Sequence, residues 1–118
     1  MILKRKKKLA RKKEIQNFNS AYNLELMAHL INGEAGNQSD ECQQAVGMVV
    51  VNRVFDKSFK QDTIKDVIFS PGQYACTKDG NFDRTPSKQA YKNAKAVLTG
   101  NTIISVPKDV VYQSQFAQ

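Results

Sequence analysis

The sequence predicts an α+β domain that is mostly helical, with a central apolar helix and a small antiparallel sheet. Three observations lead to this prediction. Residues 45–51 read AVGMVVV, which is apolar on nearly all sides and is typical of a helix surrounded by others. Residues 24–31 and 91–98 carry apolar residues at spacings of three and four, as amphipathic helices do. From residue 102 the chain becomes rich in β-branched and aromatic residues, which favour strands.

The first helix is expected to begin at Asn19 or Ser20, either of which can cap it. Gly33 is expected to end it or to start its breakdown, because glycine is common just after a helix. His29 is the only histidine and lies on this helix. We interpret it as a partly exposed or hydrogen-bonded residue rather than a metal ligand, since it has no nearby histidine or cysteine.

The central helix is expected to begin after Ser39 and to run to residue 54 or 55. Ser39 suits the N-cap, and Asp40 and Glu41 would lie in the first turn, where the helix dipole favours acids. Gly47 costs roughly 1 kcal/mol within a helix relative to alanine. We therefore expect it to mark close packing against a neighbouring element.

The second half of the chain predicts two more helices and the sheet. Residues 63–66, TIKD, have the form of a capping box for a short helix over residues 64–69. Residues 73–76 are expected to be extended, and the turn at residues 78–81 could close a hairpin. Pro86 is expected at the first position of the last helix, with Gly100 past its end. Residues 102–107 and 110–116 are expected to be strands.

Positive charge is concentrated at the start of the chain. Eight of the 18 cations lie in residues 1–13, which contain no acid, so residues 14–118 hold ten cations against all eleven acids. We therefore predict a basic N-terminal extension, residues 1–18, and one folded domain, residues 19–118. The extension is expected either to bind an anionic wall polymer or a membrane surface by charge, or to be a disordered or frayed helical segment that aids solubility.

Several other classes of protein are disfavoured. Only Phe18 lies near the basic segment as an aromatic residue, so a specific nucleic-acid partner is not expected. The start of the chain lacks the apolar core, about 7–15 residues long, of a secretory signal. Cys42 and Cys76 are too few for a disulfide framework and have no metal-type spacing. No metal or other cofactor is expected, and we expect a monomer.

Glu34 is the residue on which a chemical function can best be based. It lies between Gly33 and the small residues Ala35 and Gly36, where thin backbone lets a ligand approach. A carboxyl group at such a helix end is a candidate general acid. Position alone favours a solvated glutamate in a turn between two helices, so the case for chemistry depends on the rest of the chain.

Three motifs together resemble the SleB/CwlJ-type cell wall hydrolases, the family of spore cortex-lytic enzymes. EAGNQ at residues 34–38 is similar to the family's Glu-Ala-Arg-Gly-Glu, and VVVNRV at residues 49–54 follows at the family's spacing. PGQYAC at residues 71–76 is similar to Pro-Gly-Gln-Phe-Ser-Cys. The resemblance covers about residues 22–116. Members usually continue into a Gly-His-x-Phe-Tyr-like terminal segment, for which this sequence has no match.

The resemblance implies a lysozyme-like fold and action on the glycan strands of peptidoglycan, in the cell wall or spore cortex. Glu34 aligns with the family's catalytic glutamate and would serve as general acid and base. A hydrolase normally needs a second carboxylate, whereas a lytic transglycosylase can use one. Gln38 stands where the family has its second glutamate and cannot titrate. A lytic transglycosylase is therefore the leading hypothesis.

Three further residues are predicted to bind substrate. The amide of Gln73 could bond sugar hydroxyl or N-acetyl groups, and Tyr74 and Tyr112 could stack on sugar rings. The alternatives are that Gln73 stabilises a turn and that the tyrosines pack the core. Two other functions stay open, an N-acetylmuramoyl amidase and an inactive peptidoglycan-binding module. A zinc-dependent amidase is disfavoured because the sequence contains a single histidine.

Overall fold

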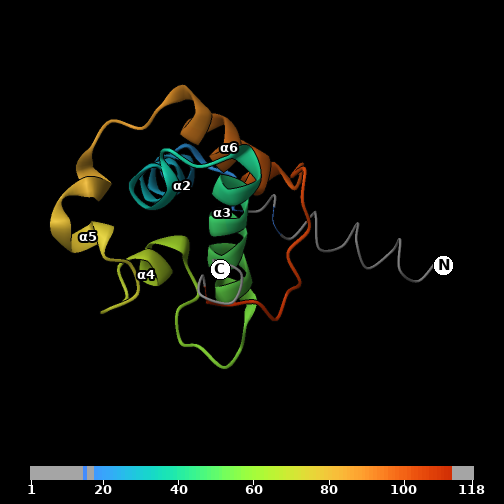
Figure 1. Cartoon of the computed structure of the whole chain (residues 1–118). Coiled ribbons are helices and arrows are strands. Elements are labelled where there is room, and N and C mark those ends of the chain that lie inside the picture. Colours follow the sequence, from blue (N-terminus) through green and yellow to red (C-terminus); the bar gives the residue numbers. More distant parts are fainter. Residues whose placement is uncertain (1–14, 16–17, 113–118) are drawn as a thin grey trace.

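Helices build the described part of the protein. The computed structural model describes residue 15 and residues 18–112, and it contains no β-strand among them. In chain order the elements are α2 (Ala21–Ala35), α3 (Asp40–Phe55), α4 (Ile64–Ile68), α5 (Cys76–Asp79), the 3-10 helix η1 (Asn81–Asp83) and α6 (Lys88–Thr99). Figure 1 shows α3 upright in the middle, with α2 and α6 near its upper end and α4 and α5 to one side.

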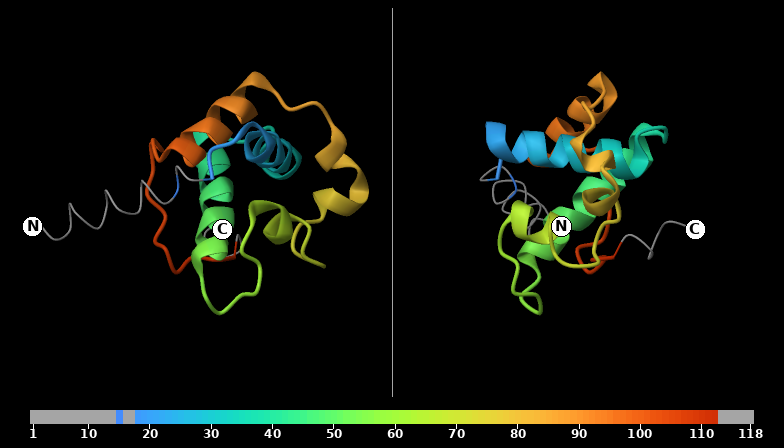
Figure 2. Two further views of the ribbon diagram at one scale, coloured as in Figure 1. Left: turned by 180° about the vertical axis from the view of Figure 1, so that it is seen from behind. Right: turned by 90° about the vertical axis from the view of Figure 1, so that its left-hand side faces the viewer.

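The hydrophobic core surrounds α3, as predicted. Helices α2, α3 and α6 pack against one another, and α4 packs against α2 and α3 (Figure 2). The largest fully buried apolar side chains come from all four helices: Met27, Leu30, Ile31, Val46, Val49, Val50, Ile64, Val67, Ile68 and Leu98. Burial of such a side chain contributes about 1.5–3 kcal/mol relative to leaving it exposed. The core therefore fixes the mutual positions of α2, α3 and α6.

Gly47 is where α3 comes closest to its neighbours. A Cβ at this position would lie 2.9 Å from Cγ2 of Val97 on α6 and 3.3 Å from Sδ of Met27 on α2. Both distances are shorter than ordinary van der Waals contact. The prediction that Gly47 marks close packing is confirmed.

Local capping signals placed most helix ends correctly. The hydroxyl of Ser20 accepts from the backbone N–H of Asn23 at 3.1 Å, and the hydroxyl of Ser39 accepts from that of Cys42 at 3.2 Å. The Thr63 hydroxyl caps α4 in the same way. Gly100 ends α6 with φ of +71°, a conformation that favours glycine.

Two predicted helix ends were wrong. Gly33 does not end α2, which continues to Ala35 with Gly36 as its C-cap. Helix α6 begins at Lys88, because the Ser87 hydroxyl accepts from the N–H of Ala90 at 3.0 Å and so caps it. Pro86 therefore lies before the helix and not at its first position.

The predicted α+β class with an antiparallel sheet was also wrong. The expected hairpin over residues 73–81 is replaced by a turn, helix α5 and η1. The N–H of Gln73 donates to the carbonyl of Ser70 at 3.1 Å, and the N–H of Asp79 donates to that of Ala75 at 3.1 Å. These local bonds satisfy the backbone that a strand would have paired with a neighbour.

The strand-like end of the sequence forms a strap and not a strand. We call residues 102–112 the C-terminal strap; it runs beside α3 (Figure 1). The side-chain amide of Asn52 donates to the carbonyls of Pro107 and Val110 at 2.9 and 3.0 Å. The Gln44 side chain accepts from the N–H of Ile103 at 2.7 Å. High β-propensity reflects packing beside other strands, and here helix side chains take their place.

Two predictions concern residues that lie wholly or partly outside the described part of the chain. The basic extension lies almost entirely outside the described residues, and the expected strand over residues 110–116 lies partly outside them. Phe18 is described, and its ring packs edge-to-face on Phe55 at a centroid distance of 5.4 Å. Within the described part of the chain, no helix has the length and apolar character needed to span a membrane.

Candidate active site around Glu34

Glu34 lies in the last turn of α2, beside the fully packed core. Its side chain is half-buried, whereas the next residue, Ala35, is 2% exposed. Burial raises the pKa of the Glu34 carboxyl, and the negative charge of Asp79 raises it further. Both effects disfavour the charged form. Glu34 thus holds its proton to a higher pH than an exposed glutamate does.

The groups around Glu34 come from the segment that includes α5. Burial raises the pKa of Cys76 to about 12, and the charges of Glu34 and Asp79 add to this effect. Burial likewise raises the pKa of Tyr74 to about 12, again with a contribution from Glu34. Glu34 therefore shares one electrostatic environment with Tyr74, Cys76 and Asp79. The thiol of Cys76 stays protonated and is not a nucleophile at neutral pH.

Tyr74 belongs to the core, although it was predicted to contact substrate. It is 3% exposed, and its hydroxyl makes no hydrogen bond of standard geometry within the described residues. The Gln73 amide and the Arg53 guanidinium both lie near enough to oppose the rise in its pKa. Tyr74 thus lies beside the Gln73 amide and within electrostatic reach of Glu34. Gln73 itself is partly buried in the turn that precedes α5.

Tyr112 lies in a different cluster, at the C-terminal end of α3. Its ring is 46% exposed and meets the Phe59 ring edge-to-face at a centroid distance of 6.0 Å. The buried guanidinium of Arg53 lies 3.9 Å from the centre of the Phe59 ring and 5.1 Å from that of Tyr112. These are cation–π distances. Arg53 therefore contacts Tyr112, and its positive charge also opposes the rise in the pKa of Tyr74.

Asp79 is the functional candidate that the sequence did not reveal. It is exposed at the end of α5, where its carboxylate accepts from the N–H of Asn81 at 3.0 Å. In the sequence it precedes Gly80 and was interpreted as part of a hairpin turn, as Asp-Gly pairs often are. The packing of α5 against α2 brings this acid near enough to Glu34 to raise its pKa, which the sequence does not reveal.

An aromatic cluster lies along α2 on the N-terminal side of Glu34. The ring of Phe82 stands 5.1 Å from that of Phe69 and 5.4 Å from that of His29. Nδ1 of His29 lies 2.6 Å from the carbonyl oxygen of Phe82, so this nitrogen donates. The interpretation of His29 as a hydrogen-bonded residue is confirmed. Phe69 is 45% exposed and was not singled out in the sequence.

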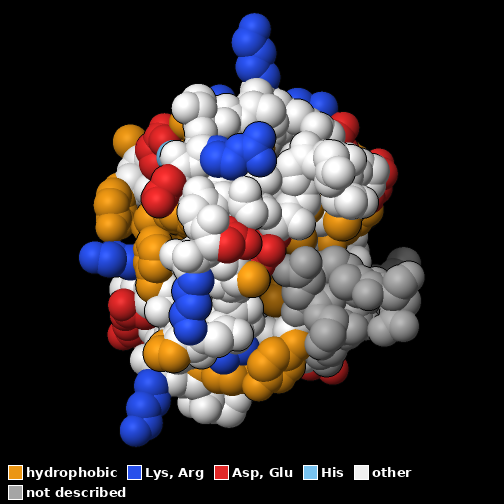
Figure 3. Space-filling model, turned by 60° about the vertical axis from the view of Figure 1, so that its left-hand side comes forward, with side chains coloured by type: hydrophobic (Ala, Val, Ile, Leu, Met, Phe, Trp, Pro, Cys, Tyr) orange, Lys and Arg blue, Asp and Glu red, His pale blue; other side chains and the backbone are white. Residues whose placement is uncertain are grey.

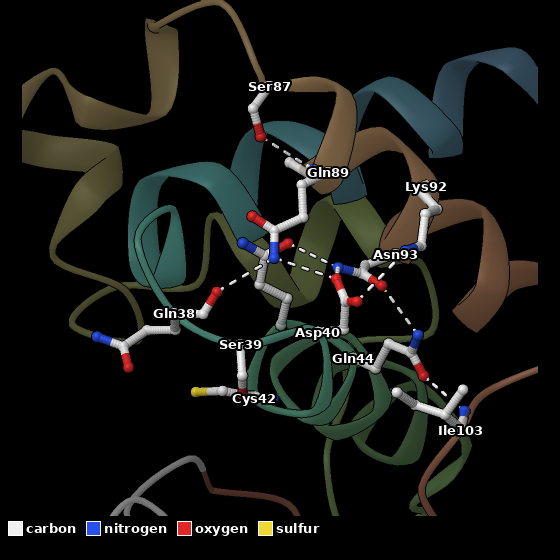
Figure 4. A network of polar contacts seen from close by, with 12 residues as sticks. Gln38, Ser39, Asp40, Cys42, Gln44, Ser87, Gln89, Lys92, Asn93 and Ile103 are labelled. Carbon is white, nitrogen blue, oxygen red and sulfur yellow. Dashed lines mark hydrogen bonds and ion pairs between the residues drawn. The ribbon is translucent and has the colours of Figure 1, made fainter.

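A second polar region adjoins the end of α2. Figure 4 shows a network in which side chains from α6 meet the first turns of α3. Asp40 accepts from Asn93, Gln89 and Lys92, and these hydrogen bonds lower its pKa to about 2. The network includes Gln43, Gln44 and Asn93, which are almost fully buried. Its acid is therefore ionised and committed to structure.

Among the described residues, no three histidine, cysteine, aspartate or glutamate side chains gather as metal ligands would. Figure 3 brings the α5 side of Figure 1 forward and shows acidic and basic side chains interspersed on that face, with hydrophobic ones scattered among them. Proton transfer by a partly buried carboxyl group is the chemistry that this arrangement supports.

Comparison with known proteins agrees with the family resemblance, and the matched range includes the motifs at residues 49–54 and 71–76. Residues 37–117, more than half of the chain, match the model of the family described as cell wall hydrolase. The chain belongs to the cell wall hydrolase family. The matched range begins after Glu34, so this family assignment rests on other residues.

The relatives are all named spore cortex-lytic enzymes. The protein from Bacillus cereus is 33% identical over 86 residues, which are 73% of this chain and 33% of the relative. The protein from Oceanobacillus iheyensis is 32% identical over 81 residues, which are 69% of this chain and 29% of the relative. This family member thus spans about a third of the length of these relatives. No solved structure matches it.

Proposed function

We propose that this chain cleaves the glycan strands of peptidoglycan as a lytic transglycosylase, with Glu34 as general acid and then general base. The observation that carries the proposal is the half-buried carboxyl of Glu34, whose pKa is raised by burial and by Asp79. A poor leaving group such as a sugar oxygen must be protonated as its bond breaks. Membership of the cell wall hydrolase family supports this choice of substrate.

The reaction needs one carboxyl group and no added water. Protonated Glu34 donates its proton to the glycosidic oxygen while the bond from that oxygen to C1 of the muramic acid breaks. The resulting carboxylate then accepts the proton of the C6 hydroxyl of the same sugar, and the C6 oxygen bonds to C1. The products are a chain with a free hydroxyl and a chain that ends in a 1,6-anhydro sugar, and Glu34 is again protonated.

The three predicted substrate-binding residues have different roles in this proposal. Gln73 would bond sugar hydroxyl or N-acetyl groups; its amide lies beside Tyr74, which is within electrostatic reach of Glu34. Tyr112 presents a partly exposed ring on which a sugar could stack. Tyr74 is buried, and we propose that it supports Gln73 and Glu34 from within the core. The place of action would be the cell wall or the spore cortex.

A hydrolase with two carboxylates is the second candidate, and Asp79 is the observation in its favour. In glycosidases of this kind one carboxyl group protonates the leaving oxygen, while the other acts as nucleophile or activates water. Asp79 is exposed and close enough to Glu34 to raise its pKa. It would then take the place that Gln38 cannot fill. The products would carry reducing ends and no anhydro sugar.

Digestion of purified peptidoglycan with analysis by mass spectrometry tests these proposals. Anhydro-muramic ends are expected from the unchanged protein, and Glu34→Gln should lower the rate by about 10²–10⁴-fold. Glu41→Gln is a matched control, since Glu41 is an exposed glutamate in the first turn of α3, and its rate should not change. New reducing ends would indicate the hydrolase, and free stem peptides an amidase. Binding without any cleavage would indicate an inactive module.

A further inference from the structure

The turn of α2 that bears Glu34 is tied to α3 by a buried amide. Nε2 of Gln43 donates to the carbonyl of Ala35 at 3.0 Å and approaches that of Gly36 at 3.5 Å. The last carbonyls of a helix lack partners within the helix, and that of Ala35 accepts both from this side chain and from the backbone N–H of Gln38 at 3.0 Å. Ala35 follows Glu34 directly in the chain. The position of the Gln43 amide thus bears on the position of Glu34.

Gln43 is itself held from α6. Its side-chain oxygen accepts from Nδ2 of Asn93 at 2.8 Å, and both side chains are 0% exposed. Nδ2 of Asn93 also donates to Oδ1 of Asp40 at 2.9 Å, so both of its protons are used. Oδ1 of Asn93 accepts from Nε2 of Gln44 at 2.9 Å. Because every polar atom of Gln43 and Asn93 is engaged, neither amide can flip without losing bonds. Figure 4 shows Asn93 between Asp40 and Gln44.

Packing of the core alone does not require these buried amides. An apolar pair of similar shape could fill the same space without any polar atom to satisfy. What the amides add is direction, since a hydrogen bond constrains both distance and angle whereas apolar contact does not. The constrained chain runs from α6 through the start of α3 to the carbonyl beside Glu34.

We propose that Gln43 and Asn93 are positioning residues, which hold the last turn of α2 in place and thereby keep the Glu34 carboxyl in its half-buried site. They touch no reacting atom and act through the backbone carbonyls of Ala35 and Gly36. The inference rests on the proposed role of Glu34, but its first test does not depend on any activity.

The test compares Gln43→Met with Val50→Ala. Methionine keeps nearly the volume of glutamine and removes the amide. Val50→Ala is the control for general destabilisation, because Val50 lies on the same helix, is 0% exposed in the apolar core and has no polar side-chain atom. Gln43→Asn is a second variant for the case that Gln43→Met does not fold; its amide is one methylene too short to reach Ala35 in the present geometry.

The first measurement is the titration of the Glu34 side chain by carbon NMR. In the Gln43 variants Glu34 should titrate at a lower pH than in the unchanged protein, because a loosened turn lets the carboxyl reach water. In Val50→Ala it should titrate as before, even if that variant melts at a similarly reduced temperature. Equal Glu34 titration in all four proteins would overturn the positioning role, whether or not the protein cleaves peptidoglycan.

The second measurement is the rate of peptidoglycan cleavage, well below the melting temperatures. Displacement of a catalytic group by about 1 Å can lower the reaction rate about 10²-fold. We therefore expect kcat of the Gln43 variants to fall by about that factor, with little change in KM. Val50→Ala should stay close to the unchanged protein. A similar loss of kcat in Gln43→Met and Val50→Ala would contradict the proposal, because general destabilisation would then explain both.

Discussion

Gly33 on α2 lies so close to Cys76 on α5 that a Cβ on Gly33 would stand 3.0 Å from both the Cβ and the Sγ of Cys76. Cys76 is 1% exposed and has little room to move away. The contact seats α5, which ends in Asp79, beside the turn that carries Glu34. Gly33 therefore serves the candidate site by permitting this approach.

Gly33→Ala is expected to loosen the site. Alanine gains roughly 1 kcal/mol of helix propensity, but overpacking a tight contact costs about 1–3 kcal/mol. Displacement of α5 should move Asp79 away from Glu34 and expose the Glu34 carboxyl to water. The pKa of Glu34 should then fall toward its ordinary value, and NMR titration of this carboxyl would measure the change.

Gly47→Ala is the control for this prediction. Its new Cβ would also clash, at 2.9 Å from Val97, but within the core and away from α5. It should lower the free energy of unfolding and leave the titration of Glu34 unchanged. If both glycine variants shifted that titration equally, the special role of Gly33 would be wrong.

Asp79→Asn is expected to change the pH dependence of activity. The negative charge of Asp79 helps to raise the pKa of Glu34, so its removal should lower that pKa. The alkaline limb of kcat/KM should move to lower pH, while activity at acidic pH is retained. Asp83→Asn, which neutralises an exposed acid on η1, should leave the profile in place. Loss of activity at every pH in Asp79→Asn would instead favour a hydrolase with two carboxylates.

Glu34→Gln is expected to stabilise the protein near neutral pH. Burial raises the pKa of Glu34 above its value in the unfolded chain. Between these two values the folded state binds more protons, so stability falls as the pH rises through this window. The glutamine variant lacks this loss. Its melting temperature should match that of the unchanged protein at about pH 4 and exceed it near pH 7; a lower value at both would refute the reasoning.

Asn52→Ala is expected to detach the C-terminal strap from α3. The amide of Asn52 is buried and donates to the carbonyls of Pro107 and Val110. Loss of these bonds should cost about 1–3 kcal/mol, measured by denaturant unfolding. Trypsin should also cut faster after Lys108, which is exposed on the strap. Asn101→Ala, at an exposed position just before the strap, should not speed this cut.

Deletion of residues 1–13 tests the predicted role of the basic extension. This segment carries eight cations and no acid. Its removal should weaken binding to anionic cell walls at low salt, and the difference should shrink at high salt, where such charges are screened. The melting temperature should change little. Binding that is independent of salt in both proteins would exclude an electrostatic role.

Local signals explain which parts of the fold were predictable. Ser20, Ser39, Thr63 and Gly100 mark helix ends through bonds to residues three or four positions away, so the sequence contains the whole interaction. The sheet was mispredicted because β-branched residues indicate an extended chain but not its partner. On the strap that partner is a set of side chains from α3, chiefly the amide of Asn52, which no local pattern reveals.

The candidate site was predictable only in part, for a related reason. Glu34 could be identified from its small neighbours and from the resemblance to a family motif. Asp79 and Gln43 could not, because their influence on Glu34 depends on how α5 and α3 meet the end of α2. Gly33 was interpreted as a helix end, whereas its lack of a side chain serves a contact with Cys76.

The acidity of Glu34 is thus assembled from segments that are remote in the chain. An unfolded or cleaved molecule would keep the glutamate but lose Cys76, Tyr74 and Asp79 as its surroundings, and the carboxyl would titrate like that of any short peptide. Under the proposed function, newly made chains would be harmless to the wall until α5 docks on α2. The titration of this single side chain would then report on maturation of the enzyme.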